Sequence, residues 1–451
     1  MFRLLLVLTL SSDQIPDIST LSLSKFQARR SLSTTNFSGE TLTTLDPLSA
    51  DYLPKDLKKD LSFLLRRDVY HPLSQGGIPA ALRTDFVARE VGASLSSLLG
   101  KLERLLVEGH YLLAAHMSGD ILTSSLVSPT DCNTIFALFY TRLACLELSG
   151  NPLFAAQESK ALEDMSSAFY YVTPDENSAD PSKANQSSTN YARHIAPWPL
   201  RVLAVRLQCI GFGDSRRGIG GLYEIGLEAR REILRPGIQE AERELWKERL
   251  ADLGIRSVNM LIEMGDFGTA RRSLNSLKAS GPVHNMRKVL LLLKIGDVEA
   301  AKQVSDACHE PSTAILKPLL SMADGRFADS VEEWRALLKT ESRSSDEVAF
   351  SQNLAVCLLY TDQLNEVCGQ QTHRTWKRTK CLTRVMQARV LLESLVSENH
   401  SFASLTFNLA TIYELCSDKS TSLKRQLAEA VAKQPVSGEV NLDRPNSDFK
   451  L

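Results

Sequence analysis

Glycine, small and apolar residues recur at fixed distances along most of this chain. Six glycines are each followed five positions later by a small residue and twelve positions later by an apolar one. An aspartate continues the series once residues 367–387 are set aside. This spacing is typical of the elbow of a helix-turn-helix unit, and it indicates a scaffold rather than a catalytic pocket. The seven anchors are Gly109, Gly150, Gly213, Gly265, Gly296, Gly325 and Asp362.

Each part of the pattern has a physical reason. Glycine or aspartate ends the first helix, and an apolar residue two positions on packs into the bend. The small residue lets the second helix approach the first closely, and later positions pack inward at helical spacing. This is the second half of a tetratricopeptide-like repeat. Besides the anchors, the repeat-defining residues are Tyr111, Ala114, Ala155, Phe267, Ala270, Ala301, Phe327, Trp334 and Ala388.

The periodicity predicts an all-α fold, a right-handed α-solenoid of about eight tetratricopeptide-like helix hairpins over residues 94–433. Short helices are expected over 54–93, while the aperiodic segments 1–53 and 434–451 are predicted to be disordered tails. The polar tract 173–192 is predicted to be a long loop between repeats. Pro318 predicts a kink or a shortened start in its helix. Helix pairs are predicted over 94–123, 133–166, 198–234, 240–280, 283–308, 312–339, from 345 onward, and over 401–432.

Residues 367–387 interrupt the seventh pair with a glycine and a basic run. When these 21 residues are left out, Ala388 falls at the small position, and Leu392 and Leu395 fall at the two packing positions. We therefore hypothesise that the segment is a retained intron, which sequencing of the transcript tests. The alternative is an ordinary surface insertion, which solenoids tolerate at turns.

Composition and charge exclude some classes of function. The chain has 451 residues, of which 43% are hydrophobic and 23% are charged, as in ordinary globular proteins. Its formal net charge of −1 gives no indication of nucleic-acid or anionic-membrane binding. No apolar run approaches the length of a membrane span. The eight cysteines form no C-x-x-C pair and are interpreted as reduced thiols of a cytosolic protein.

The N-terminus carries the one signal that disagrees. Residues 4–10 are apolar apart from Thr9 and follow Arg3, which is similar to a short signal-peptide core. No small-residue cleavage site is present, and Asp13 and Pro16 follow directly. A misplaced start codon or a disordered tail fits the rest of the chain better. A secreted or lumenal enzyme is kept as a third class of function, and it rests on this segment alone.

The sequence shows no constellation that indicates catalysis, a cofactor or a metal. There is no phosphate-binding G-x-x-x-x-G-K-[ST] loop, no H-E-x-x-H and no G-x-S-x-G. Gly218, Gly220 and Gly221 follow no predicted strand, which favours helix packing or a flexible helix start over a nucleotide site. Cys308-His309-Glu310 lies at a helix end, where adjacent side chains diverge and do not form a metal site. The basic run 374–380 lies within the doubtful segment, so a nucleic-acid patch is not inferred from it.

The C-terminal third of the chain carries a specific resemblance. The runs at 353–360 (NLAVCLLY), 404–415 (SLTFNLATIYEL) and 427–432 (LAEAVA) resemble the trafficking protein particle (TRAPP) complex subunit 12 family. Upstream, residues 136–148, Tyr170-Tyr171 with Pro174, and residues 199–203 extend the similarity over about 94–432. The long acidic N-terminal region of animal members is absent, and segment 367–387 departs from the family pattern.

The resemblance implies a non-catalytic scaffold subunit of a TRAPP III-type vesicle-tethering complex, in endoplasmic-reticulum-to-Golgi transport and autophagy. It implies TRAPP subunits 8, 11 and 13 as partners, a Rab GTPase as an indirect one, and a cytoplasmic location, peripheral at Golgi and ER–Golgi membranes. No cofactor, nucleic acid or integral membrane span is expected. The alternative is a generic co-chaperone or peptide-docking adaptor. That class would place Lys and Arg on the groove-facing first helices, whereas residues 353–360 and 287–294 are apolar through their middles.

Overall fold

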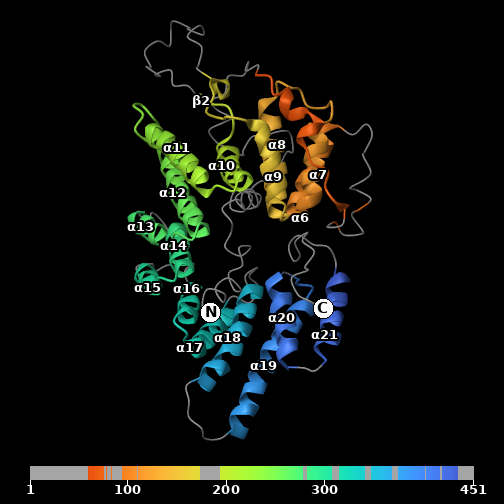
Figure 1. Cartoon of the computed structure of the whole chain (residues 1–451), viewed down its shortest axis with the longest axis vertical. Coiled ribbons are helices and arrows are strands. Elements are labelled where there is room, and N and C mark those ends of the chain that lie inside the picture. The colour runs from red at the N-terminus through yellow and green to blue at the C-terminus, as the bar shows by residue number, and fades with distance from the viewer. Residues whose placement is uncertain are drawn as a thin grey trace. The chain divides into compact units, whose positions relative to one another are not determined.

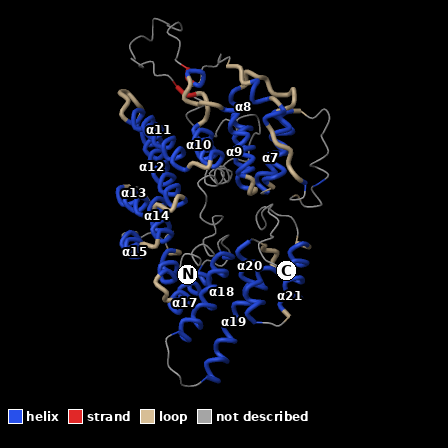
Figure 2. The backbone as a smooth tube through the Cα atoms, in the orientation of Figure 1, coloured by secondary structure: helices blue, strands red, loops and turns tan. Residues whose placement is uncertain are grey.

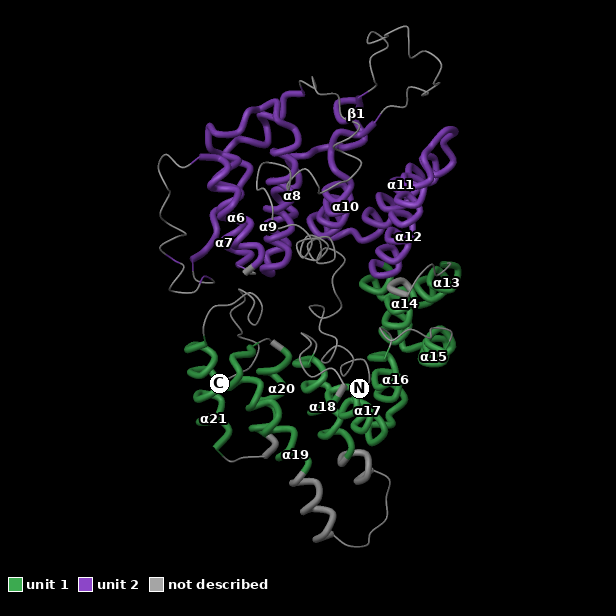
Figure 3. The backbone as a smooth tube through the Cα atoms, turned by 180° about the vertical axis from the view of Figure 1, so that it is seen from behind, with its two compact units in different colours: residues 1–17, 261–441, 445–451 green, residues 18–260, 442–444 purple. Residues whose placement is uncertain are grey.

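The computed structural model describes most of the predicted repeat region. The described residues are 59–75, 78, 83, 94–108, 110–172, 193–277, 282–306, 314–340, 347–367, 374–401, 403–416 and 419–434. The predicted N-terminal tail, the predicted loop 173–192 and, apart from residue 434, the predicted C-terminal tail lie outside these ranges. The chain divides into two compact units, and Figure 3 colours them separately: unit 2 comprises residues 18–260 and 442–444, and unit 1 comprises residues 1–17, 261–441 and 445–451.

The described chain is almost entirely helical, which confirms the predicted all-α class (Figures 1 and 2). Within each unit, helices that follow one another in sequence pack against one another, and several also contact the next helix but one. This is the contact pattern of an α-solenoid, because each hairpin buries its apolar face only by stacking on its neighbours.

Unit 2 is a stack of helical hairpins. Its helices are α6 (Leu95–Glu108), α7 (Tyr111–Leu122), α8 (Cys132–Leu148), α9 (Pro152–Ser159), α10 (Trp198–Phe212), α11 (Ser215–Ile233) and α12 (Glu240–Glu263), whose last residues belong to unit 1.

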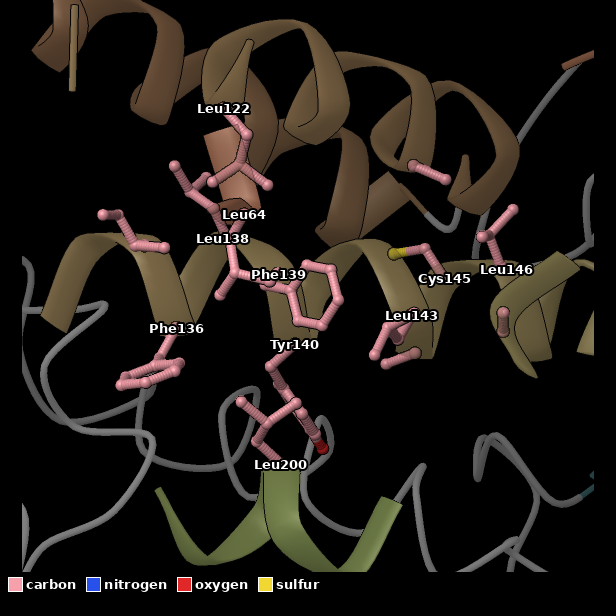
Figure 4. Close-up of a cluster of buried hydrophobic side chains, with 14 of the residues drawn as sticks. Leu64, Leu122, Phe136, Leu138, Phe139, Tyr140, Leu143, Cys145, Leu146 and Leu200 are labelled. Carbon is pink, nitrogen blue, oxygen red and sulfur yellow. The ribbon is translucent and has the colours of Figure 1, made fainter. Parts of the chain in front are cut away.

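Helix α8 is the centre of unit 2. It is apolar on every side, as expected of a helix that is enclosed by others, and most of its residues are buried. Figure 4 shows Leu138, Phe139 and Leu143 of this helix within the apolar cluster, which Leu64 and Leu200 also join. The cluster therefore binds the segment before the first hairpin and helix α10 to the same central helix.

A second apolar cluster joins α10, α11 and α12. Trp198 and Trp246 pack edge to face with their ring centroids 5.3 Å apart. Two glycines allow α11 to lie close to its neighbours: a Cβ at Gly218 would lie 2.2 Å from Met260, and one at Gly221 would lie 2.9 Å from a methyl group of Val205. Close helix packing is therefore the role of these glycines, as the sequence predicted.

The connections of unit 2 differ from the prediction in two places. The short helix expected around residues 56–67 appears as two 3₁₀ turns, η2 (Ser62–Leu65) and η3 (Arg67–Val69). Helix α9 ends early and is followed by further 3₁₀ turns, η6 (Lys160–Leu162) and η7 (Ala168–Tyr170). The sequence also gave no indication of the two-residue strands β1 (Tyr171–Val172) and β2 (Arg193–His194), which pair antiparallel.

Unit 1 continues the hairpin pattern. Its helices are α13 (Phe267–Ser276), α14 (Pro282–Ile295), α15 (Val298–Asp306), α16 (Leu316–Ala323), α17 (Phe327–Thr340), α18 (Glu347–Val367), α19 (Arg374–Ser397), α20 (Ala403–Cys416) and α21 (Ser420–Ala432). Helix α16 is short because Pro318 lies in its first turn, where a missing N–H is tolerated. This is the shortened start that the sequence predicted.

The structure differs from the prediction at Asp362. A turn was expected there, but α18 continues through this position to Val367. The local sequence explains the difference, because residues 361–367 contain neither glycine nor proline to end a helix. Residues 374–387 form the first part of α19, and Ala388, Leu392 and Leu395 after them are buried. The retained-intron hypothesis stays a prediction for transcript sequencing.

Candidate interaction site

Five glycine anchors adopt the same backbone conformation. Gly150, Gly213, Gly265, Gly296 and Gly325 have φ between 63° and 90°, a left-handed region that costs other residues about 1–2 kcal/mol. At each one, the following N–H donates to the carbonyl five residues earlier, as in Asp266 N to Leu261 O at 3.0 Å. This 6→1 bond closes a Schellman motif and satisfies an otherwise unpaired helical carbonyl.

The residue after several of these glycines starts the next helix. Asp266 accepts a hydrogen bond from the N–H of Thr269 at 3.0 Å, and Asp297 accepts one from Ala300 at 3.2 Å. Each carboxylate is an N-cap and also lies at the positive end of the helix dipole. A Gly-Asp pair therefore ends one helix and begins the next within two residues.

The predicted small positions all lie in the helix interfaces. The side chains of Ala114, Ala155, Ala270, Ala301 and Ala388 are fully buried, with no measurable exposure. A larger side chain at these positions would push two packed helices apart. Of the apolar positions in the bends, Phe327 is buried and stacks on Tyr360, whereas Tyr111 and Phe267 are partly exposed.

One seam shows how three helices lock together. Ser330 of α17 takes the small position, and its hydroxyl donates to the carbonyl of Pro318 in α16 at 3.0 Å. The same hydroxyl lies 3.4 Å from the sulfur of Cys357 in α18. Trp334 is fully buried beside Phe350, also of α18. Burial raises the pKa of the Cys357 thiol to about 12, so it stays a neutral packing group.

Three further positions differ from these five glycine elbows. Gly109 lies outside the described residues, although the N–H of His110 makes the same 2.9 Å bond to Leu105 O. Asp362 is not an elbow, as described above. Sequence analysis missed Asn399, which has φ 70° and ends α19, with the N–H of His400 donating to Leu395 O at 3.0 Å. Asparagine tolerates this conformation better than other non-glycine residues, and that was the signal available.

A buried ion pair fastens the segment before α6 to the first hairpins. Arg142 of α8 donates to both carboxylate oxygens of Glu158 of α9, at 2.9 and 2.6 Å. Its remaining N–H groups donate to the carbonyls of Ala115 and His71, each at 2.9 Å. The N–H of His71 in turn donates to Glu158 at 2.8 Å. Both charged side chains are almost completely buried, so each depends on the other for compensation.

The described residues contain no group of three or more His, Cys, Asp or Glu side chains that could hold a metal ion. Within the same ranges, no helix is both long and apolar enough to cross a membrane. Cys308-His309-Glu310 lies outside the described residues. Four cysteines whose side chains are described are buried and form no disulfide with one another: Cys132, Cys145, Cys209 and Cys357.

Exposed apolar side chains gather on one helix of unit 2. Tyr223 and Leu227 of α11 and Leu234 at its end are 56%, 50% and 80% exposed. They lie four and seven residues apart, which places them on one face of the helix. The opposite face, with Leu222, is buried in the second cluster.

Fold and surface together define a helical-hairpin repeat protein, a class whose members act through the surfaces that they present. Models of known protein families give no match to the chain. Trafficking protein particle complex subunit 12 of Homo sapiens is 24% identical over 231 residues, covering 47% of this chain and 27% of the human protein. The Mus musculus protein of the same name is also 24% identical over 231 residues, which cover 47% of this chain and 25% of that protein. The chain thus matches about a quarter of the length of these relatives.

Among solved structures, the crystal structure of the P58(IPK) TPR domain is similar at 12% identity. The alignment covers 74% of this chain and 91% of that one, with a TM-score of 0.20. A likeness this weak does not support any statement about function.

Proposed function

We propose that this protein is a non-catalytic scaffold subunit of a TRAPP III-type vesicle-tethering complex. The observation that carries the proposal is the series of glycine elbows, each followed by a fully buried small residue. Such a series serves to hold helices in a fixed stack and presents their outer faces to partners. The sequence similarity to TRAPP complex subunit 12 supports the choice of assembly.

In this role the chain would contact TRAPP subunits 8, 11 and 13 and act on a Rab GTPase only indirectly. Its place would be the cytoplasm, at the surface of Golgi and ER–Golgi membranes, in transport between these compartments and in autophagy. The chemistry of nucleotide exchange would belong to other subunits of the complex. The absence of a metal cluster among the described residues is compatible with this division but does not carry it.

The alternative is a peptide-docking adaptor. Side-chain polar atoms of Gln352 and Asn353 on α18 and of Asn408 on α20 have no hydrogen-bond partner among the described residues, but these atoms are buried. A docked peptide cannot reach them, so they do not favour this alternative.

Affinity purification of the full chain tests the first proposal. We expect TRAPP subunits 8, 11 and 13 to co-purify in stoichiometric amounts. A matched sample carries Ala270→Phe, which overfills one helix interface and should lose those subunits. Recovery of chaperones in place of TRAPP subunits would favour the adaptor instead.

A further inference from the structure

We propose that the outer face of α11 is a docking surface for an acidic amphipathic helix of a partner protein. The face comprises Arg216, Gly220, Tyr223, Leu227, Arg230, Arg231 and Leu234, all of which are exposed. This deepens the proposed scaffold role by naming the surface and the chemistry of its partner. The proposal depends on the scaffold role in one respect only, namely that the partner belongs to the same assembly.

The face is apolar along its centre. Tyr223, Leu227 and Leu234 form an apolar stripe. From Arg216 to Leu234 the face is about 27 Å long. Gly220 lies on the same face, and a Cβ there would meet no atom within 4 Å. The backbone is therefore open at this point, and a partner helix of about eighteen residues could approach closely along the stripe.

The charges of the face set the sign of the partner. Arg216 and Arg230 lie within the stripe, and Arg231 lies beside it. None of these three guanidinium groups takes part in an ion pair among the residues that the structure describes. The acidic groups of the face are Glu224 and the N-cap Asp214, so positive charge exceeds negative. Unpaired arginines around an apolar stripe complement a helix with apolar residues on one side and carboxylates on its flanks.

The basic surface continues past the start of the helix. Phe212, at the end of α10, is 56% exposed. The guanidinium carbon of Arg217 lies 4.4 Å from the centre of its ring, and the Lys160 ammonium lies 5.8 Å from it. Aromatic and arginine side chains together are typical of protein interfaces.

The geometry favours a protein over a membrane or a second copy of this chain. Helix α11 is held by its buried face against α10 and α12, and Figures 1 and 3 show it at the margin of its unit. It cannot turn to bury a broad apolar face in lipid, and its three apolar residues are few for that purpose. Self-pairing through the same face would bring the arginines of both copies together with few carboxylates to balance them.

A binding assay with a defined probe tests the surface itself. The probe is a synthetic eighteen-residue helix with leucine on one side and glutamate on its flanks, and the matched peptide has lysine in place of glutamate. Fluorescence anisotropy with the full chain should show that the glutamate peptide binds at least about ten-fold more tightly than the lysine peptide, and that added salt weakens it.

Variants separate the face from the rest of the chain. Leu227→Ser should weaken binding of the glutamate peptide by about ten-fold or more, and Arg216→Glu with Arg230→Glu should do the same. Leu153→Ser, at an equally exposed leucine of α9, should have no effect. All three variants should keep the circular dichroism spectrum of the unaltered protein, because the altered side chains are exposed. Equal binding of the two peptides, or insensitivity to Leu227→Ser, would refute the proposal.

A crosslink in the assembled complex identifies the partner. When Tyr223 is replaced by benzoylphenylalanine, we expect a crosslink to an acidic segment of the partner in which apolar residues recur every three or four positions. The proposal is overturned if the crosslink forms to a second copy of this chain, to a basic segment or to no protein. It is also overturned if the chain floats with phosphatidylserine vesicles and Leu227→Ser abolishes this flotation. If the peptide binds as expected but no TRAPP subunit co-purifies, the surface stands and the tethering role fails.

Discussion

The buried pair Arg142–Glu158 allows a sharp prediction about stability. In Arg142→Met, the carboxylate of Glu158 stays fully buried, and among the described residues it keeps the hydrogen bond from the His71 N–H and the His71 Nδ1 at 3.5 Å. The carbonyl of His71 loses the Arg142 donor, and the carbonyl of Ala115 keeps only the Ser118 hydroxyl, at 2.9 Å, among the side-chain donors of the described residues. Removing one partner of a buried ion pair costs about 3–5 kcal/mol. We therefore expect the free energy of opening around α8 to fall by about 4 kcal/mol.

Hydrogen exchange measures this loss directly. A decrease of about 4 kcal/mol corresponds to roughly thousand-fold faster exchange of the α7, α8 and α9 amides. The double variant Arg142→Met with Glu158→Leu should recover at least about half of the loss, because it leaves no uncompensated charge. Asp68→Asn removes the exposed Arg66–Asp68 ion pair and should leave exchange unchanged.

The reasoning would be refuted by either of two results. One is an acceleration of less than about ten-fold in Arg142→Met, which would mean that the buried charge is compensated in another way. The other is a double variant as unstable as the single one, which would mean that packing rather than charge dominates the loss.

Three further predictions concern backbone, packing and pH. Gly265→Ala should destabilise unit 1 by about 1 kcal/mol in urea unfolding, because Gly265 has a φ of 77°. Gly268→Ala, inside α13, should instead stabilise unit 1 by about 0.5 kcal/mol. Equal effects of the two substitutions would contradict this prediction. Gly218→Ala should lower the stability of unit 2 by about 1–3 kcal/mol, because its Cβ would lie 2.2 Å from the nearest atom, while Gly220→Ala meets open space and should not. Burial, and next the charge of Arg201, lowers the pKa of His194 to about 4, so the folded state favours the neutral ring. The contribution of His194 to the free energy of unfolding is complete above the unfolded pKa of about 6.5, and about 3 kcal/mol of it is lost as the pH falls from there to about 4. A His194→Gln variant whose free energy of unfolding keeps the same pH dependence over this window would contradict the prediction.

The hydrogen bonds of His194 fix the tautomer of the neutral ring. Its Nδ1 accepts from the N–H of Ala196 at 3.0 Å, so the proton resides on Nε2, which donates to the carbonyl of Met165, also at 3.0 Å. Protonation of Nδ1 would break the first of these bonds. The ring also stacks on Tyr170, which holds it in place.

The elements of this fold could be predicted from sequence to a large extent, because their causes are local. Gly265, Gly296 and Gly325 mark turns because few other residues adopt a positive φ without strain. Pro318 shortens its helix for a reason contained in the residue itself. The elbow at Asp362 was misplaced because the pattern was matched across a segment that continues the helix instead. The β1–β2 pairing was missed because two residues are too few to show an alternating pattern.

The sequence by itself determined where most of the described helices begin and end, which small residues lie between them, and hence that this is an all-α repeat protein. Only the tertiary structure decided that Arg142 meets Glu158 and the backbone of His71, which is 71 residues away in sequence. It alone also decided that Tyr223 and Leu227 face outward while Leu222 is buried. Helix starts and stops depend on neighbouring residues, whereas partners and exposed faces depend on which surfaces other helices cover.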